Sequence, residues 1–147
     1  MESGPLEALT ALRPTPRSPR VLIIEDDAPI GYLMATILSM AGYDVVTALD
    51  GWTGLEALDE TDLDLVLLDL RLPDSDGTEV LSRIRASKRT STVPVLVVSA
   101  EISARYDDGG ASLDAHGVLQ KPFTDVDLLD HVARLTGGGA SPASDLP

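Results

Sequence analysis

Three runs of aliphatic residues, each apolar at every position and each followed by a polar side chain, restrict the fold of this chain most strongly. They cover residues 21–24, 65–68 and 95–98, and two shorter β-branched or apolar pieces lie at 45–47 and 118–119. A strand that is apolar at every position needs cover on both faces, which is typical of a parallel sheet. The pattern therefore predicts five parallel strands, most of them buried.

The segments between these runs carry apolar residues at helical spacing. Such faces run through residues 30–41, 80–84 and 126–133, and residues 52–58 form a shorter candidate. Strands and helices in alternation predict a doubly wound α/β sheet with helices on both faces. A (β/α)8 barrel is excluded, because it needs about 250 residues. Trp52, at the start of the shortest helix, is expected to pack against its neighbours and not to belong to a site.

Composition indicates one folded domain with a flexible segment at each end. The chain has 147 residues, about the size of one domain. Residues 1–19 and 137–147 are rich in Pro, Gly, Ser and Ala and are expected to remain flexible tails. The folded domain is therefore expected to cover residues 20–136. The absence of cysteine from the sequence excludes disulfides, thiolate metal sites and cysteine nucleophiles.

The charge balance argues against two classes of partner. The chain has 24 acidic and 11 basic residues, a formal net charge of −13. This excess of negative charge repels phosphate backbones and anionic lipids, so we expect the domain to bind neither nucleic acid nor membrane. No apolar run approaches the ~20 residues that span a bilayer, and the N-terminus lacks the charge order of a signal peptide. We expect a cytoplasmic location.

Polar side chains follow four of the predicted strands. Glu25 and Asp26 follow the first, Asp69 the third, Ser99 the fourth and Lys121 the fifth. In open parallel sheets the carboxyl ends of the strands share one edge, and ligands bind in the crevice beyond it. We therefore expect three carboxylates, a hydroxyl and an ammonium group to meet in one shallow pocket.

This set of groups suits a divalent cation and a phosphoryl group. Three carboxylates in one pocket would repel one another, and Mg²⁺ would relieve that repulsion. A carboxylate can then act as a nucleophile and form an aspartyl phosphate, with the lysine and the hydroxyl neutralising phosphoryl oxygens. Each residue taken alone has a simpler structural explanation; Asp26 or Asp27, for example, could cap the next helix. The conjunction at four strand ends favours the site.

Four segments carry a resemblance to a known family. They are VLIIEDDAPI (21–30), LVLLDLRLPDSDG (65–77), PVLVVSA (94–100) and GVLQKPF (117–123). In these segments and their order, the chain resembles the receiver domain of two-component response regulators, of the CheY-like superfamily. The resemblance covers about residues 20–136 and implies a flavodoxin-like sheet with strand order 2-1-3-4-5.

The resemblance implies a role for each acidic residue of the pocket. Asp69 is similar to the family's phosphoryl acceptor. Asp26 is similar to the residue that binds Mg²⁺ directly, and Glu25 to the second acid, which acts through water. The backbone carbonyl of Arg71 is implied as a further ligand of the metal, beside Asp69.

The remaining site residues follow from the same resemblance. Ser99 stands where the family has a hydroxyl that moves to the phosphoryl group, and Lys121 where a lysine pairs with phosphoryl oxygens. Ala100 matches a small residue that keeps the pocket open. The bond between Lys121 and Pro122 is expected to be cis, and Gly77 is expected to allow the turn into the next helix.

Two features depart from the family's pattern. Val118 stands where the family usually has an aromatic residue that reports phosphorylation to partners, so that route of coupling is in doubt. Residues 101–116 should contain a helix, but Gly109 and Gly110 would each cost about 1 kcal/mol in its interior. We expect a short or locally mobile helix, over about residues 102–108.

The leading functional hypothesis is a phosphorylation-controlled signalling switch. A histidine kinase or histidine phosphotransfer protein would supply the phosphoryl group to Asp69, and an unidentified downstream protein would receive the signal. The chain would be no enzyme beyond its own phosphorylation and dephosphorylation, and either a stand-alone receiver or a fragment of a larger regulator. One alternative is a receiver-like interaction module that is not phosphorylated. The other, a Mg²⁺-dependent phosphatase with an aspartate nucleophile, lacks its second acid, since Arg71 stands there.

Overall fold

The computed structural model describes residues 18–60, 62–72, 74, 76–100 and 115–137. Within this part of the chain, five strands alternate with four helices. Their bounds are β1 (Arg20–Ile24), α2 (Ala28–Met40), β2 (Asp44–Ala48), α3 (Gly51–Glu60), β3 (Leu65–Leu68), α4 (Gly77–Ala86), β4 (Val95–Ser99), β5 (Gly117–Gln120) and α5 (Asp125–Leu135). The helix expected over 102–108 and most of both expected tails lie outside the described residues.

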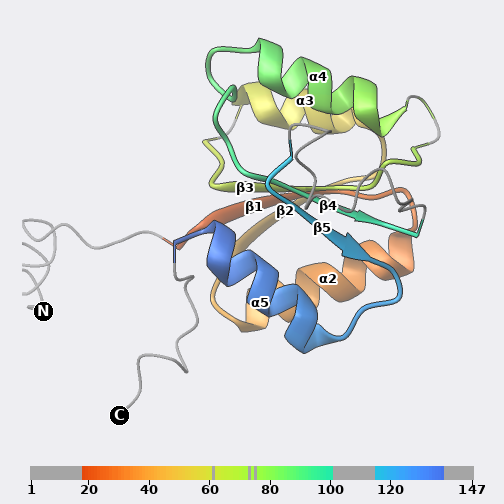
Figure 1. Ribbon diagram of the computed structural model, residues 1–147, viewed down its shortest axis with the longest axis vertical. Coiled ribbons are helices and arrows are strands. Elements are labelled where there is room, and N and C mark those ends of the chain that lie inside the picture. Colours follow the sequence, from red (N-terminus) through yellow and green to blue (C-terminus); the bar gives the residue numbers. More distant parts are fainter. Residues whose placement is uncertain (1–17, 61, 73, 75, 101–114, 138–147) are drawn as a thin grey trace, which may run out of the picture.

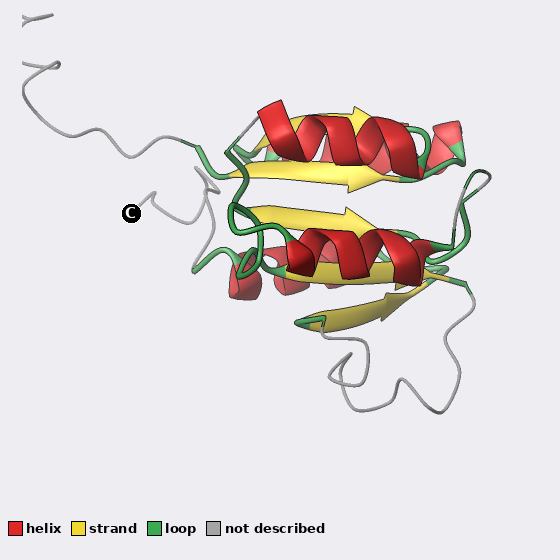
Figure 2. Cartoon of the chain, turned by 90° about the horizontal axis from the view of Figure 1, so that it is seen from above, coloured by secondary structure: helices red, strands yellow, loops and turns green. Residues whose placement is uncertain are grey.

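The strands form one parallel sheet in the order β2-β1-β3-β4-β5. Helices α2 and α5 cover one face of the sheet, and α3 and α4 cover the other (Figure 1). The view in Figure 2 shows the strand arrows pointing in one direction, so their carboxyl ends share one edge. The predicted fold class and strand order are confirmed.

The central strands are buried on both faces because alternate residues enter two hydrophobic layers. Ile23 of β1 belongs to the layer that contains Met34 of α2 and Leu128 of α5. Its neighbour Ile24 belongs to the opposite layer, with Ile84 of α4. The uniformly apolar runs in the sequence are thus the consequence of a sheet with helices packed on each side.

Local hydrogen bonds explain where the helices begin and end. The side chain of Asp27 accepts the Ile30 N–H at 3.2 Å and caps α2, and Gly42, with φ of 98°, ends the turn that follows α2. Thr124 and Asp127 form a capping box at the start of α5. Among the described residues, no helix combines the length and apolarity needed to cross a membrane.

Trp52, which was expected to pack against its neighbours, does so at the surface of the protein. Its side chain is 63% exposed, because the buried positions of α3 are occupied by Gly51, Gly54 and Leu58. The indole instead lies beside Arg83 of α4, whose guanidinium carbon is 5.8 Å from the ring centroid. This distance suits a cation–π contact between two exposed side chains.

Candidate functional site

The three acidic residues come together because β1 and β3 are neighbours. Their register pairs Ile24 with Leu68, and the Asp69 N–H donates to the Ile24 carbonyl at 3.1 Å. Glu25 and Asp69 therefore leave adjacent strands at the same level. A carboxylate oxygen from each of these two residues and one from Asp26 all lie within 4.8 Å of one another.

Ser99 and Lys121 reach the same edge from β4 and β5. The register of these strands pairs Ser99 with Gln120, and the Lys121 N–H donates to the Ser99 carbonyl at 3.1 Å. Ser99 is fully buried. The peptide bond between Lys121 and Pro122 is cis, as expected. The structure thus brings together the four strand ends that the sequence singled out.

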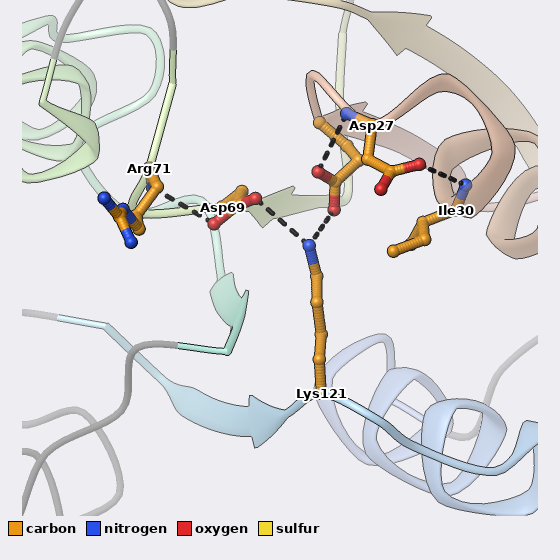
Figure 3. Close-up of polar contacts among 6 residues, drawn as sticks. Asp27, Ile30, Asp69, Arg71 and Lys121 are labelled. Carbon is orange, nitrogen blue, oxygen red and sulfur yellow. Dashed lines mark hydrogen bonds and ion pairs between the residues drawn. The ribbon is translucent and has the colours of Figure 1, made fainter.

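Lys121 connects two of the carboxylates. Its Nζ lies 2.5 Å from Oε1 of Glu25 and 3.1 Å from Oδ2 of Asp69, and Figure 3 shows the side chain extended toward Asp69. Backbone amides reach the other carboxylate oxygens: the Arg71 N–H donates to Asp69 Oδ1 at 3.1 Å and the Asp27 N–H donates to Glu25 Oε2 at 3.2 Å. The orientation of both carboxylates is therefore defined by contacts at each oxygen.

The electrostatics of the site show more negative charge than one lysine compensates. Burial raises the pKa of Glu25 to about 7, although Lys121 acts in the opposite direction, and nearby Asp69 raises it further. Burial alone would lower the pKa of Lys121, but the two carboxylates outweigh burial and raise it. The lysine is therefore held as a cation, and an additional positive charge would be stabilised here.

The donor set fits Mg²⁺. Oε1 of Glu25 is buried, and its printed contact is the ion pair with Nζ of Lys121 at 2.5 Å. Asp26, by contrast, is exposed and leaves one side of the cluster open to water. Mg²⁺ prefers oxygen ligands and keeps several waters, which matches a partly open cluster of carboxylates.

Asp27 has a structural role and stands apart from the acidic cluster. Its side chain caps α2, and its N–H orients the Glu25 carboxylate. The choice between Asp26 and Asp27 as the helix cap, which the sequence left open, is thus decided for Asp27. Asp26 is free of that capping role.

Gly77 is required for a reason that differs from the predicted one. Its φ is not in the left-handed region, which among the described glycines holds only Gly42 and Gly137. A Cβ at Gly77 would instead lie 2.5 Å from the Leu70 Cα and 2.6 Å from the carbonyl oxygen of Asp69. Glycine allows α4 to begin directly against the backbone that follows β3.

Val118, which stands where the family usually has an aromatic residue, makes contacts with aliphatic side chains. Val118 is half-buried and packs against Leu70 and Val97. It thus contacts the residue that follows Asp69 in the chain. Ala100, the small residue at the end of β4, is exposed at the same edge of the sheet.

Asp74 is a residue that the sequence analysis missed. It lies in the loop between β3 and α4, and its two carboxylate oxygens accept the N–H groups of Gly51 and Trp52, each at 2.9 Å. These amides belong to the first turn of α3. An acid in the loop after Asp69 is the only signal in the sequence, and it does not indicate which helix the side chain reaches.

The structure defines a doubly wound α/β domain with an acidic pocket at the carboxyl edge of its sheet, and comparisons with known proteins identify the family. Residues 21–133 match the family model described as the response regulator receiver domain. The chain therefore belongs to the response regulator receiver domain family. Receiver domains act as phosphorylation switches of two-component systems, not as enzymes in the usual sense, and bind Mg²⁺ at an acidic pocket.

Curated relatives are similar to about four fifths of the chain. The DNA-binding dual master transcriptional regulator RpaA of Synechocystis is 40% identical over 117 residues, which cover 80% of this chain and 48% of RpaA. The transcriptional regulatory protein CpxR of Escherichia coli K12 is 33% identical over 113 residues, covering 77% of this chain and 47% of CpxR. The chain thus spans about half the length of these relatives.

Solved structures show the same fold. The chemotaxis response regulator CheY4 of Vibrio cholerae matches with a TM-score of 0.75 and 29% identity, covering 80% of this chain and 98% of CheY4. The receiver domain of the sensor histidine kinase PA1611 from Pseudomonas aeruginosa, solved with a magnesium ion in its active-site cleft, matches with a TM-score of 0.74 and 25% identity. That match covers 82% of this chain and 98% of the PA1611 domain. The predicted resemblance to a receiver domain is confirmed.

Proposed function

We propose that this chain is a switch whose phosphoryl acceptor is Asp69 and whose donor is a histidine kinase or a histidine phosphotransfer protein. One observation carries the proposal: carboxylate oxygens of Glu25, Asp26 and Asp69 lie within 4.8 Å of one another, with Lys121 in contact with two of these residues. Asp69 contacts both Lys121 and the Arg71 amide. Asp69 follows β3, which lies between β1 and β4 in the sheet, and is therefore the central member of the pocket.

Mg²⁺ is the proposed cofactor. Glu25, Asp26 and Asp69 would hold it, with the backbone carbonyl of Arg71 as a further ligand. When bound, Mg²⁺ supplies positive charge that offsets the repulsion between the carboxylates and a phosphoryl group. The close approach of these three carboxylates, with one oxygen of each within 4.8 Å of the others, supports this assignment.

The proposed reaction transfers a phosphoryl group from a phosphohistidine to Asp69. A carboxylate oxygen of Asp69 forms a bond to phosphorus while the phosphorus–nitrogen bond breaks, and the electron pair leaves with the imidazole nitrogen, which takes up a proton. The product is an acyl phosphate. Attack of water on phosphorus later releases inorganic phosphate, restores the carboxylate and resets the switch.

Two side chains would hold the transferred group. Lys121, which in the structure pairs with Asp69 at 3.1 Å, would pair with a phosphoryl oxygen, and the Ser99 hydroxyl would donate to another. Their altered partners would shift an equilibrium between two conformations of the domain. A downstream protein that prefers the phosphorylated conformation would receive the signal. The aliphatic environment of Val118 supports an output that does not use the aromatic residue.

Chemical labelling tests the proposal. The protein is incubated with Mg²⁺ and acetyl phosphate, and a hydroxylamine-sensitive acyl phosphate is measured for wild type, for Asp69→Asn and for Asp125→Asn, an exposed acid on α5. We expect labelling of the wild type and of Asp125→Asn, and none of Asp69→Asn. Absence of any label would favour an unphosphorylated interaction module. Sustained turnover of the donor at enzyme-like rates would favour a phosphatase.

A further inference from the structure

The loop between β3 and α4, which follows Asp69 and is called the acceptor loop below, is attached to a helix that lies far from it in sequence. The carboxylate of Asp74 accepts two N–H groups of the first turn of α3, from Gly51 and Trp52, at 2.9 Å each. These contacts span 22 and 23 residues of chain. A carboxylate is well suited to this position, because the N-terminus of a helix carries unpaired N–H groups and a partial positive charge.

Further bonds join the residues at the two ends of the same loop and cap the helix that follows it. Arg71 and Asp76 form an antiparallel bridge across it, and the Gly77 N–H donates to the Leu70 carbonyl at 3.0 Å. The Asp76 side chain accepts the Thr78 N–H at 2.9 Å and caps α4. These bonds connect the two ends of the loop to each other. Asp74 adds an attachment to a third element.

Because the two ends of the loop are bonded to each other, Asp74 can affect the orientation of the Asp69 carboxylate. The Arg71 amide, which donates to Asp69 Oδ1 at 3.1 Å, belongs to the residue that is bridged to Asp76. Asp76 is two residues from Asp74. A displacement at Asp74 would therefore pass through the bridge to the amide that orients the Asp69 carboxylate.

We infer that Asp74 is a positioning residue for phosphorylation, which holds the acceptor loop on the first turn of α3 and so keeps the Asp69 carboxylate in its reactive orientation. This inference rests on the function proposed above. It also connects the site to Trp52, whose own N–H is one of the two bonded amides and whose indole is exposed beside Arg83. Movement of the acceptor loop would therefore reach the outer face formed by α3 and α4.

The chain offers a matched control at the same helix terminus. The Asp50 side chain accepts the Thr53 N–H at 2.8 Å and so caps the first turn of α3 from within its own segment. Asp50→Ala and Asp74→Ala each remove one carboxylate from this turn. Of the two, Asp74→Ala is the variant that removes the bonds between this loop and α3.

The first readout does not need phosphorylation. Amide hydrogen exchange is measured for Arg71 and Gly77 in wild type, Asp74→Ala and Asp50→Ala, without Mg²⁺ or donor. We expect exchange at least tenfold faster in Asp74→Ala than in Asp50→Ala at both amides. Equal exchange rates in the two variants would overturn the inference, whether or not the protein proves to accept phosphate.

The second readout separates positioning from folding. Labelling by acetyl phosphate with Mg²⁺ is followed against donor concentration, together with the emission of Trp52, the single tryptophan of the chain. We expect Asp74→Ala to lower the maximal labelling rate at least threefold relative to Asp50→Ala, with the half-saturating donor concentration changed less than twofold. We also expect it to reduce the change in Trp52 emission on labelling.

Asp74→Asn, which keeps one acceptor oxygen, should give an intermediate rate and guards against failure of Asp74→Ala to fold. Equal maximal rates in all variants would contradict the inference, whereas absence of labelling in the wild type would refute the proposed function.

Discussion

Nζ of Lys121 lies 2.5 Å from Oε1 of Glu25, although β5 and β1 are separated in the sheet by β3 and β4. The lysine side chain crosses the ends of two intervening strands and also contacts Asp69, which follows β3. The side chain of Glu25 is only 2% exposed. A single cation that follows the edge strand therefore offsets part of the negative charge buried near the centre of the sheet.

Removal of this cation should destabilise the domain. In Lys121→Met, which keeps most of the aliphatic stem, Glu25 and Asp69 would remain buried without a cationic partner. We expect a loss of about 3 kcal/mol in the free energy of unfolding, the lower end for a broken buried ion pair, because the lysine retains some contact with solvent. Urea denaturation in EDTA at pH 8 measures it. Lys88→Met, at an exposed lysine, is the control, and an equal loss in both variants would contradict the role of Lys121.

Asp26 and Asp27 should respond differently to magnesium, although they are adjacent. We expect Mg²⁺ to raise the melting temperature of the wild type, since a ligand that binds only the folded state stabilises it. Asp26→Asn should abolish most of that increase. Asp27→Asn, which preserves a side-chain oxygen for the Ile30 N–H, should retain it. Thermal denaturation with MgCl₂ or EDTA measures both, and an undiminished increase in Asp26→Asn would show that Asp26 is not a ligand.

Two glycine substitutions should have opposite effects on stability. At Gly77 a Cβ would lie 2.5 Å from the Leu70 Cα, which is backbone and cannot move alone, whereas at Gly31 the nearest atom, Cγ of Glu25, is 3.7 Å away. We expect Gly77→Ala to cost about 1–3 kcal/mol through overpacking. Gly31→Ala, inside α2, should stabilise the domain by up to about 1 kcal/mol through helix propensity. Chemical denaturation of both variants decides this, and stabilisation by Gly77→Ala would show that the contact relaxes freely.

Much of the fold and of the candidate site could be predicted from local patterns. The apolar runs that became β1, β3 and β4 end where the structure ends them to within one residue. The convergence of Glu25, Asp69 and Lys121 follows from the parallel direction of the strands, because side chains after parallel strands emerge at one edge. The strand order came from the family resemblance, since periodicity alone does not specify which strands are neighbours.

The features that the sequence did not reveal depend on contacts between segments distant in sequence. Trp52 is exposed because glycines of its own helix occupy the face against β1, where a Cβ on Gly54 would lie 2.5 Å from Cδ1 of Ile24. The link from Asp74 to α3 joins a loop to the first turn of a helix that is distant in sequence. No helical or strand period relates the residues at either contact, so local reasoning could not find them.

Burial pattern and strand direction are properties of short stretches of chain, and they were enough to determine from the sequence the α/β class and the edge at which the charged groups gather. The tertiary structure alone decided which atoms meet there: which acid caps α2, how far Lys121 reaches, and why Gly77 has no side chain. Those outcomes depend on separations of a few ångströms between backbones that pack together only in the folded protein. A pattern along the chain carries no information about such separations.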